Sequence, residues 1–289
     1  MGTHFQSQAA NKRGMALNLK TEEGVEIFRK LSSQADVIVE NFRTGAMNRL
    51  GLGYDDIRKI NPGIIYCSVT GFGHTGPKSE HAAFDNTIQA FSGMMQQNGP
   101  ADDDAVLVGP PVVDYGAGLL AAFAISSALF RRERTGKGQY LDVAMLDAAL
   151  MLMTSSVLNV NTTGREPGRS RYARTPYAAY GGYHTSDGEI LMIGAVPPQH
   201  YEKLWHVLGR EDLAAEMSDL RTTDMARRSN RDEQVIADAL ATKTAGEWEE
   251  LFLEGGLPAA RVRTLNEALK SEQVRSRGHS HRRLQKRVY

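Results

Sequence analysis

Two hydrophobic patterns alternate along the first half of the chain. Short runs rich in β-branched residues are typical of buried parallel strands, and apolar residues that recur every three or four positions are typical of helices. Strands are expected at residues 35–42, 63–70 and 140–144, and helices at residues 21–33, 54–60, 85–91, 114–132 and 146–157. This alternation predicts an α/β fold with a doubly wound parallel sheet.

The second half of the chain has a different pattern. Residues 159–174 are rich in Asn, Thr, Gly, Pro and Arg and are expected to form a linker. A β-hairpin is predicted at residues 180–193, followed by helices at 200–208, 230–241 and 245–255 and a closing segment at 257–262. These elements predict a smaller α+β domain. The domains are therefore expected at residues 1–165 (large), 166–262 (small) and 263–289 (return segment and tail), with fraying from residue 275.

Composition argues against several classes of function. The 289 residues include 34 Lys or Arg and 34 Asp or Glu, so no overall charge favours nucleic acid or a membrane surface. The one cysteine, Cys67, fits a reducing compartment and is expected to be buried in its strand. No segment is expected to reach the roughly 18 apolar residues of a membrane span, and residues 1–14 have no secretory hydrophobic region. We therefore expect a soluble cytoplasmic chain.

Two motifs suggest a cofactor or a metal, and both are rejected. Residues 71–76 fit the pattern G-x-G-x-x-G, but the dinucleotide fingerprint must open directly into a helix that holds the pyrophosphate. Here a polar turn follows, and the next helical pattern starts only near Phe84. The three carboxylates at residues 102–104 lack the alternate spacing of a calcium loop. We expect neither a nicotinamide or flavin cofactor nor a metal.

Residues 112–123 place a carboxylate, Asp114, at the start of a helix that is apolar on nearly every side. A helix with this pattern is expected to be buried. Two interpretations of Asp114 stay open at this point. Aspartate often caps a helix by accepting bonds from unpaired backbone N–H groups. Alternatively, Gly116 and Gly118 leave room for a ligand, and the carboxylate serves as a nucleophile.

Several blocks of the chain resemble the class III CoA-transferase family of the CaiB/BaiF type, which includes formyl-CoA transferase-like proteins. The blocks follow the family's order and lie at residues 11–20, 35–45, 68–77, 114–118, 134–139, 175–177, 258, 265–269 and 273–278. The resemblance implies a Rossmann-like large domain, a smaller domain on long linkers, and an interlocked homodimer. It also implies acyl-CoA and a carboxylic acid as substrates, with no permanently bound cofactor.

The resemblance implies that Asp114 is the catalytic residue. Asp114 is expected to attack an acyl-CoA thioester and give an aspartyl anhydride; the CoA thiolate then forms an aspartyl thioester, from which an acceptor carboxylate takes the CoA. Backbone N–H groups at residues 116–118 are expected to stabilise the oxyanions. The implied CoA site consists of Leu17, Asn18, Leu19, Lys20, Asn41, Phe42, Arg43 and Arg49, with Ala82, Ala83, Phe84 and Asp85 near the pantetheine arm.

The chain departs from the family in two places. Racemases of the family pair the aspartate with a histidine just before the residue that matches Asp85, where this chain has Phe84, and His81 lies three residues too early. Because racemisation needs two acid–base groups, CoA transfer is preferred and an acyl-CoA racemase or isomerase is the alternative. The chain is also expected to start after the family's first strand and helix, so a truncated inactive relative is a third interpretation. The acyl donor and acceptor are left open.

Overall fold

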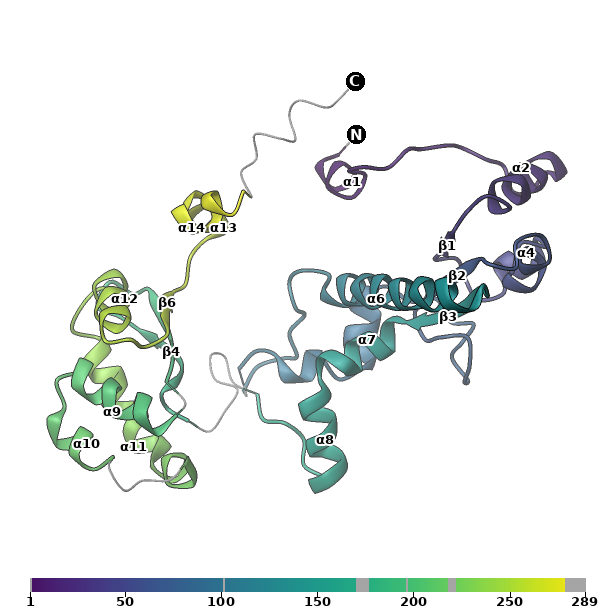
Figure 1. The fold of residues 1–289 in the computed structure, drawn as a ribbon. Helices are drawn as coiled ribbons and strands as arrows, with labels where there is room; N and C mark the ends of the chain where they lie inside the picture. The colour runs from purple at the N-terminus through teal and green to yellow at the C-terminus, as the bar shows by residue number, and fades with distance from the viewer. Residues whose placement is uncertain (1, 101, 170–176, 196, 218–221, 279–289) are drawn as a thin grey trace. The chain divides into compact units, whose positions relative to one another are not determined.

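The computed structural model describes residues 2–100, 102–169, 177–195, 197–217 and 222–278. It divides into two compact units, Met1–Pro167 and Gly168–Tyr289 (Figure 1). Residues 170–174 of the expected linker, residues 175 and 176 of the family resemblance, and residues 279–289 of the expected tail lie outside the described residues. The assignment of a catalytic domain, a small domain and a return segment stays a prediction.

The first unit contains a parallel three-stranded sheet. Its strands are β1 (Val37–Glu40), β2 (Ile65–Thr70) and β3 (Gln139–Ala144), in the order β1-β2-β3. Val37, Ile65 and Gln139 stand in register. β2 is central, and five of its six residues are buried because it pairs on both edges. The α/β fold with a parallel sheet is therefore confirmed.

The helices of the first unit precede, connect and follow these strands. They are α1 (Thr3–Gln8), α2 (Glu22–Ser32), α3 (Ala46–Arg49), α4 (Tyr54–Ile60), α5 (Asp85–Phe91), the 3₁₀ turn η1 (Met95–Gln97), α6 (Val112–Thr135), α7 (Met145–Leu152) and α8 (Thr154–Thr163). Residues 71–84 form no helix, which supports the rejection of the dinucleotide fingerprint. The prediction of a single helix at residues 146–157 is wrong. Two helices, α7 and α8, are separated at Met153, whose φ of −105° and ψ of 20° are not helical. α8 also runs five residues into the expected linker.

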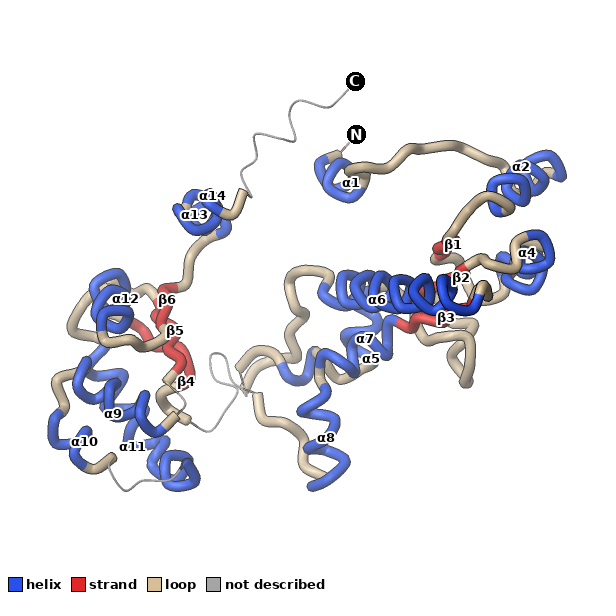
Figure 2. The backbone as a smooth tube through the Cα atoms, viewed as in Figure 1, coloured by secondary structure: helices blue, strands red, loops and turns tan. Residues whose placement is uncertain are grey.

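Different helices cover the two faces of the sheet. Successive side chains of a strand point to opposite faces. Tyr66 of β2 therefore packs with Met47 and Ile57 of α3 and α4, whereas Cys67 packs with Ala121 of α6. Figure 2 shows α6 running alongside β3. Cys67 is fully buried, as expected, and this burial raises the pKa of its thiol to about 11.

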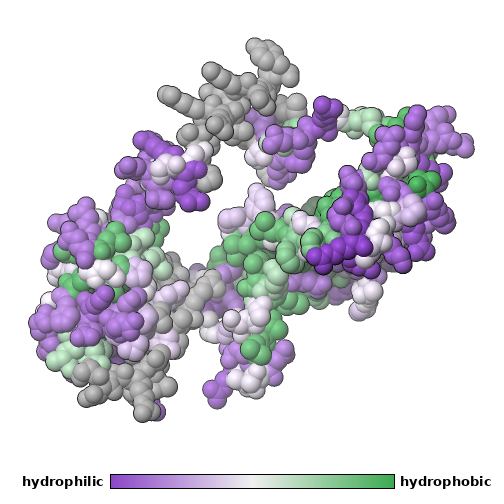
Figure 3. Space-filling model, in the orientation of Figure 1, coloured by the Kyte–Doolittle hydropathy of each residue, from purple (hydrophilic) through white to green (hydrophobic). Residues whose placement is uncertain are grey.

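α6 is more exposed than its sequence predicted. Its buried residues are small: Ala121 packs on the sheet and Ala117 packs against α5 and α7, while Leu119 and Phe123 are 73% and 72% exposed. Figure 3 shows hydrophobic residues at the surface of the first unit. By length and composition alone α6 is apolar enough to cross a membrane, which corrects the expectation that no segment reaches that limit. An all-round apolar pattern cannot show which side a helix packs on, and here close packing selects the small residues.

The second unit contains an antiparallel sheet covered by helices. Its strands are β4 (Tyr180–His184), β5 (Ile190–Gly194) and β6 (Ala259–Arg261), in the order β4-β5-β6 (Figure 2). Its helices are α9 (Pro198–Val207), α10 (Glu211–Ala215), α11 (Thr222–Leu240), α12 (Ala245–Glu254), α13 (Leu265–Lys270) and α14 (Glu272–Ser276). The predicted hairpin and closing segment are confirmed. The short helices α10, α13 and α14 were missed, because one or two turns give too little periodicity to detect, and α11 starts eight residues before the predicted residue 230.

Candidate active site

A cavity of about 500 Å³ opens at the ends of β1 and β2 in the first unit. We call it the Asp114 cavity. Its wall contains these predicted site residues: Asn41, Phe42, Arg43, Ala82, Ala83, Phe84 and Asp114. They come from the loop after β1, the loop after β2 and the first turn of α6. Parallel α/β sheets bind ligands at the carboxyl ends of their strands, so this position is suitable for a substrate.

The loops around the Asp114 cavity are held close together. The Nδ2 group of Asn41 donates a hydrogen bond to the carbonyl oxygen of Val69 at 2.5 Å and ties the end of β1 to β2. Gly71 follows β2, and a Cβ atom at this position would overlap the Cβ of Ala83. Glycine is therefore required for the segment around Ala83 to pass this close to the strand end.

Asp85, and not Asp114, caps α6. The Oδ2 atom of Asp85 accepts hydrogen bonds from the backbone N–H groups of Val113 at 2.8 Å and of Asp114 at 3.1 Å. α6 begins at Val112 after the N-cap residue Pro111, so Asp114 lies in the first turn and its side chain makes no cap bond. The N-cap interpretation of Asp114 is therefore wrong, because the capping carboxylate comes from α5. As a result, the Asp114 carboxylate is left to face the cavity.

A buried glutamine holds Asp85 in place. Gln89 lies one turn later on α5 and is fully buried. Its Nε2 group donates to Asp85 Oδ1 at 2.6 Å, and its Oε1 atom accepts from the backbone N–H of Val108 at 3.0 Å. Both carboxylate oxygens of Asp85 thus accept hydrogen bonds, and Asp85 fixes the backbone of Asp114. The predicted contact of Asp85 with CoA stays a prediction.

The pKa of the Asp114 carboxyl is raised above its ordinary value. Partial burial is the larger cause, because it disfavours the charged form, and the negative charge of Asp85 adds to it. Carboxylates with a raised pKa are more basic and often mark functional sites. Asp114 therefore has the position and the electrostatics of a nucleophile or a base.

The predicted oxyanion-binding turn at residues 116–118 is wrong. These residues lie inside α6, where backbone N–H groups bond to the carbonyl four residues earlier. Gly116 instead permits close packing against α7, since a Cβ there would lie 3.3 Å from Leu152 Cδ1. Gly118 lines the Asp114 cavity, and no atom lies within 4 Å of where its Cβ would be. Gly118 therefore keeps that wall open.

The other residues predicted to bind CoA do not line the Asp114 cavity. Leu17, Asn18, Leu19 and Lys20 precede α2: the backbone N–H of Lys20 donates to Asn18 Oδ1 at 3.1 Å, and Leu19 packs against the cluster beneath α4. Arg49 is the last residue of α3. The first unit does not gather these side chains with Asp114, and their role in CoA binding stays a prediction.

His81 lies on the wall of the Asp114 cavity, which its spacing in the sequence did not reveal. Its ring stands edge-on to Phe72, with centroids 6.4 Å apart and an interplanar angle of 79°. Phe72 in turn packs against Phe91 of α5, at 5.1 Å. The loop after β2 thus folds back and brings a histidine into the same cavity as Asp114. The signal in the sequence was a histidine in the glycine-rich loop ahead of α5.

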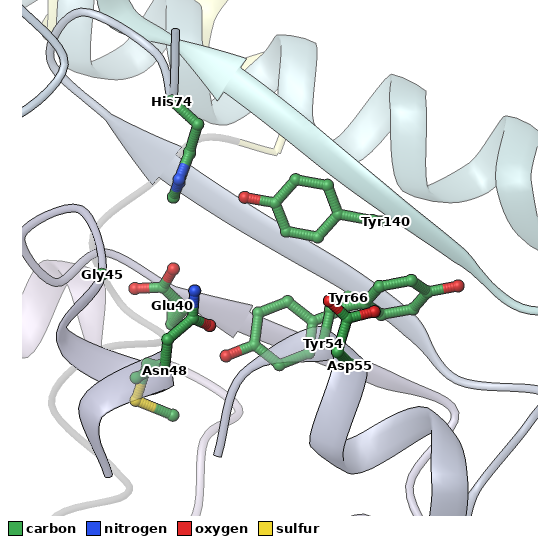
Figure 4. Close-up of a pocket in the computed structure, with 9 residues that line it drawn as sticks. Glu40, Gly45, Asn48, Tyr54, Asp55, Tyr66, His74 and Tyr140 are labelled. Carbon is green, nitrogen blue, oxygen red and sulfur yellow. The ribbon is translucent and has the colours of Figure 1, made fainter. Parts of the chain in front are cut away.

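A second cavity, of about 280 Å³, lies on the sheet face that α3 and α4 cover (Figure 4). We call it the tyrosine cavity, because Tyr54, Tyr66 and Tyr140 line it. Glu40 and His74 also line it, and the Ser68 hydroxyl connects them: it donates to Glu40 and lies 2.8 Å from His74 Nε2. None of these residues was predicted to line a site, because they come from three strands, a helix and a loop.

The described part of the chain contains no group of three or more His, Cys, Asp or Glu side chains placed to hold a metal ion. The acidic residues at 102–104 lie in the loop after η1. There the Oδ1 atom of Asp103 accepts a hydrogen bond from the backbone N–H of Asp104 at 2.8 Å. The loop thus uses one of these carboxylates to hold its own backbone.

Comparisons with known proteins agree on one family. The family model described as CoA-transferase family III matches residues 1–287. The chain is 35% identical to the succinyl-CoA:glutarate CoA-transferase of Mus musculus, over 96% of this chain and 63% of that protein. It is 33% identical to the alpha-methylacyl-CoA racemase of Mus musculus, over 93% of this chain and 70% of that protein. A solved structure, a CaiB/BaiF family protein from Brucella suis, is 34% identical with a TM-score of 0.77, over 92% of this chain and 70% of that one. The chain thus spans less than two thirds of the glutarate transferase.

Proposed function

The chain belongs to CoA-transferase family III, and we propose that it moves CoA from an acyl-CoA thioester to a free carboxylic acid, with Asp114 as the nucleophile. One observation carries this proposal. Asp114 stands in the first turn of α6, Asp85 takes the capping role, and the Asp114 carboxylate lies on the wall of a 500 Å³ cavity. If Asp114 served only to stabilise α6, its carboxylate would be expected to cap the helix, a role that Asp85 fills instead.

The proposed reaction proceeds through covalent intermediates on Asp114. An oxygen of Asp114 attacks the thioester carbonyl; a C–O bond forms, the C–S bond breaks, and CoA leaves as its thiolate. The thiolate then attacks the aspartyl carbonyl, which releases the donor acid as a carboxylate and leaves CoA on Asp114 as a thioester. An acceptor carboxylate attacks this thioester, and the thiolate it expels attacks the acceptor's carbonyl. Asp114 is regenerated with no net change in protons.

Neighbouring residues suit the parts of such a substrate. Ala82 and Ala83 are small and leave room for the pantetheine arm beside Phe42 and Phe84. Arg43 is exposed on the same wall and offers a positive charge to an anionic acid or phosphate. Among the predicted residues outside the cavity, we propose Lys20 and Arg49 as phosphate partners.

Trapping of the intermediate tests the proposal. The protein is mixed with acyl-CoAs and hydroxylamine and analysed by peptide mass spectrometry. A hydroxamate on Asp114 is expected, and none in Asp114→Ala. The control Asp56→Asn, an exposed carboxylate on α4, should keep the adduct. Folded protein that gives no adduct with any acyl-CoA, or gives one in Asp114→Ala, would contradict the assignment.

Racemisation or another isomerisation of an acyl-CoA is the second candidate. It is favoured by one observation, that His81 shares the Asp114 cavity and could supply the second acid–base group. It predicts exchange of the α-proton of an acyl-CoA with deuterated water in the absence of any acceptor acid. Loss of that exchange in His81→Gln, with transfer intact, would separate the two activities.

Assembly and location are part of the same proposal. We propose a cytoplasmic homodimer that holds no permanent cofactor and binds neither nucleic acid nor a membrane. The exposed apolar face of α6 supports assembly, since large apolar patches usually mark interaction surfaces. Sedimentation equilibrium at micromolar concentration should give the mass of two chains, and a monomer would contradict the dimer.

A further inference from the structure

The tyrosine cavity is separate from the site of the proposed reaction. It shares no lining residue with the Asp114 cavity, and it lies beneath α3 and α4. Its volume of about 280 Å³ accommodates a small organic molecule. The proposed chemistry at Asp114 makes no use of it.

The walls of the tyrosine cavity are aromatic. The ring of Tyr140 on β3 lies 5.6 Å from the ring of Tyr54 on α4 and 6.1 Å from the ring of Tyr66 on β2, measured between centroids. Figure 4 shows the Tyr54 and Tyr140 hydroxyls directed toward the space around Glu40 and His74. Burial raises the pKa of Tyr140 to about 12, so its ring is neutral at physiological pH. The faces of neutral aromatic rings attract cations.

The charge of this cavity is negative. The Glu40 carboxylate at the end of β1 accepts hydrogen bonds from the Ser68 hydroxyl and, at 2.7 Å, from the backbone N–H of Phe42. Neither donor carries a positive charge, and no Lys or Arg occurs among the described residues that line the cavity. His74 reaches Glu40 only through the Ser68 hydroxyl. A carboxylate beside aromatic rings, with no Lys or Arg on the described wall, is the arrangement that an organic cation completes.

The chain itself shows a cation against one of these rings. The guanidinium carbon of Arg58 lies 5.6 Å from the centroid of Tyr54, and Arg58 pairs with Asp55 at 3.0 Å. Asp55, also on the cavity wall, thus already has its cation, whereas no Lys or Arg side chain in the described part of the chain pairs with Glu40. Glu40 is the carboxylate available to a ligand.

We propose that the tyrosine cavity binds a small organic ammonium ion, with Glu40 as the counter-ion and the rings of Tyr54 and Tyr140 beside it. Acyl-CoA and carboxylic acids do not suit this cavity, because their negative charges meet the Glu40 carboxylate and no Lys or Arg on the described wall. The ammonium site is therefore independent of the CoA chemistry at Asp114, and its test does not depend on the outcome of the test for CoA transfer.

The test uses the full chain labelled with 3-fluorotyrosine and observed by ¹⁹F NMR. Tyr54→Phe and Tyr140→Phe assign the two resonances. Tetramethylammonium chloride and methylammonium chloride should each shift both resonances saturably, whereas sodium chloride at equal ionic strength and neutral tert-butanol should not. Glu40→Gln should weaken the ammonium affinity by about tenfold, equivalent to about 1.4 kcal/mol. Asp56→Asn, which removes an exposed carboxylate from the same helix as Tyr54, should leave the affinity unchanged.

Three results of the NMR titration would overturn the proposal. Shifts that do not saturate, that sodium chloride reproduces, or that persist unchanged in Glu40→Gln overturn it. If Glu40→Gln fails to fold, because Glu40 also holds Ser68 and Phe42, then Tyr140→Leu takes its place. That variant keeps the carboxylate but removes a ring, and the saturable shift of Tyr54 should then weaken by at least severalfold. An unchanged affinity in Tyr140→Leu would also overturn the proposal.

Discussion

The two units of the chain differ in how completely they bury their apolar residues. In the second unit, Tyr201, Trp205, Trp248 and Phe252 belong to one buried cluster that joins the sheet and its helices. In the first unit the buried residues form three smaller clusters, and large side chains of α6 such as Leu119 and Phe123 stay exposed. The second unit has one large core, and the Asp114 cavity and the tyrosine cavity both lie in the first unit.

The two cavities gather features of the first unit that oppose stability. Within the first unit a carboxylate with a raised pKa lies on a cavity wall, glycines permit close approaches, and a second cavity keeps an acidic side chain among aromatic rings. Such features cost stability, and they are common at binding and catalytic sites. Four substitutions test this contrast.

The largest effect is expected in the core of the second unit. Phe252→Ala removes a fully buried ring and should lower the free energy of unfolding by about 3–5 kcal/mol. Urea unfolding followed by circular dichroism measures the change. The neighbouring Leu253 is 57% exposed, and Leu253→Ala should change the free energy by less than about 0.5 kcal/mol. Equal losses from the two variants would contradict a single closed core.

A smaller loss is expected at the strand end of the first unit. Gly71→Ala places a Cβ on top of Ala83, so the segment must move, at a cost of about 1–3 kcal/mol. The matched variant Gly118→Ala meets no atom and should stabilise α6 by up to about 1 kcal/mol, because alanine favours helices. Thermal unfolding of both variants gives the comparison. A neutral Gly71→Ala would show that the close approach is not required.

Removal of the remote cap is expected to cost about 1–2 kcal/mol. Asp85→Ala leaves the N–H groups of Val113 and Asp114 without their acceptor. It also removes a negative charge, so the pKa of the Asp114 carboxyl should fall, which ¹³C NMR of the labelled carboxyl can follow. Asp85→Asn keeps an acceptor oxygen and should lose less stability. Similar losses in the two variants would mean that charge, rather than the cap bonds, is what Asp85 supplies.

The smallest change is expected at Asp114 itself, and it has the opposite sign. A carboxyl whose pKa is higher in the folded than in the unfolded chain opposes folding once pH rises above its unfolded value, ordinarily 3.8. Asp114→Asn should therefore be slightly more stable than the parent chain at pH 7, and the difference should disappear as pH falls below that value. Urea midpoints at pH 7 and pH 3 measure it. A variant that is less stable at pH 7 would indicate that the charged carboxylate is stabilising.

The sequence predicted the elements of the fold well because the signals are local. Apolar runs predict the strands β1, β2 and β3, of which only β2 is largely buried. Thr21 caps α2, as predicted, by accepting a hydrogen bond from the backbone N–H of Gly24 at 3.2 Å. Cys67 is buried, as an apolar run predicts. The sequence also pointed to Asp114, through its glycine-rich, apolar surroundings.

The errors came from interactions between residues that are distant in the sequence. Asp85 caps a helix that starts 27 residues later, so Asp114 looked like the cap although it is not. His81 reaches the Asp114 cavity only because the loop after β2 folds back. α6 was expected to be buried, but several of its large side chains are exposed. A pattern that is apolar on every side does not show which side of the helix packs against the rest of the protein.

The sequence by itself thus determined the order of strands and helices, the parallel sheet and the family of this protein. The strands and helices follow from hydrophobic periodicity and turn residues, which are local signals, and the family follows from the order of short motifs along the chain. Only the tertiary structure decided which carboxylate caps α6 and which faces a cavity, and only it brought three tyrosines and Glu40 together from separate strands and a helix. The physical reason is that burial, capping and electrostatic environment depend on neighbours in space, and chain folding supplies those neighbours from distant positions.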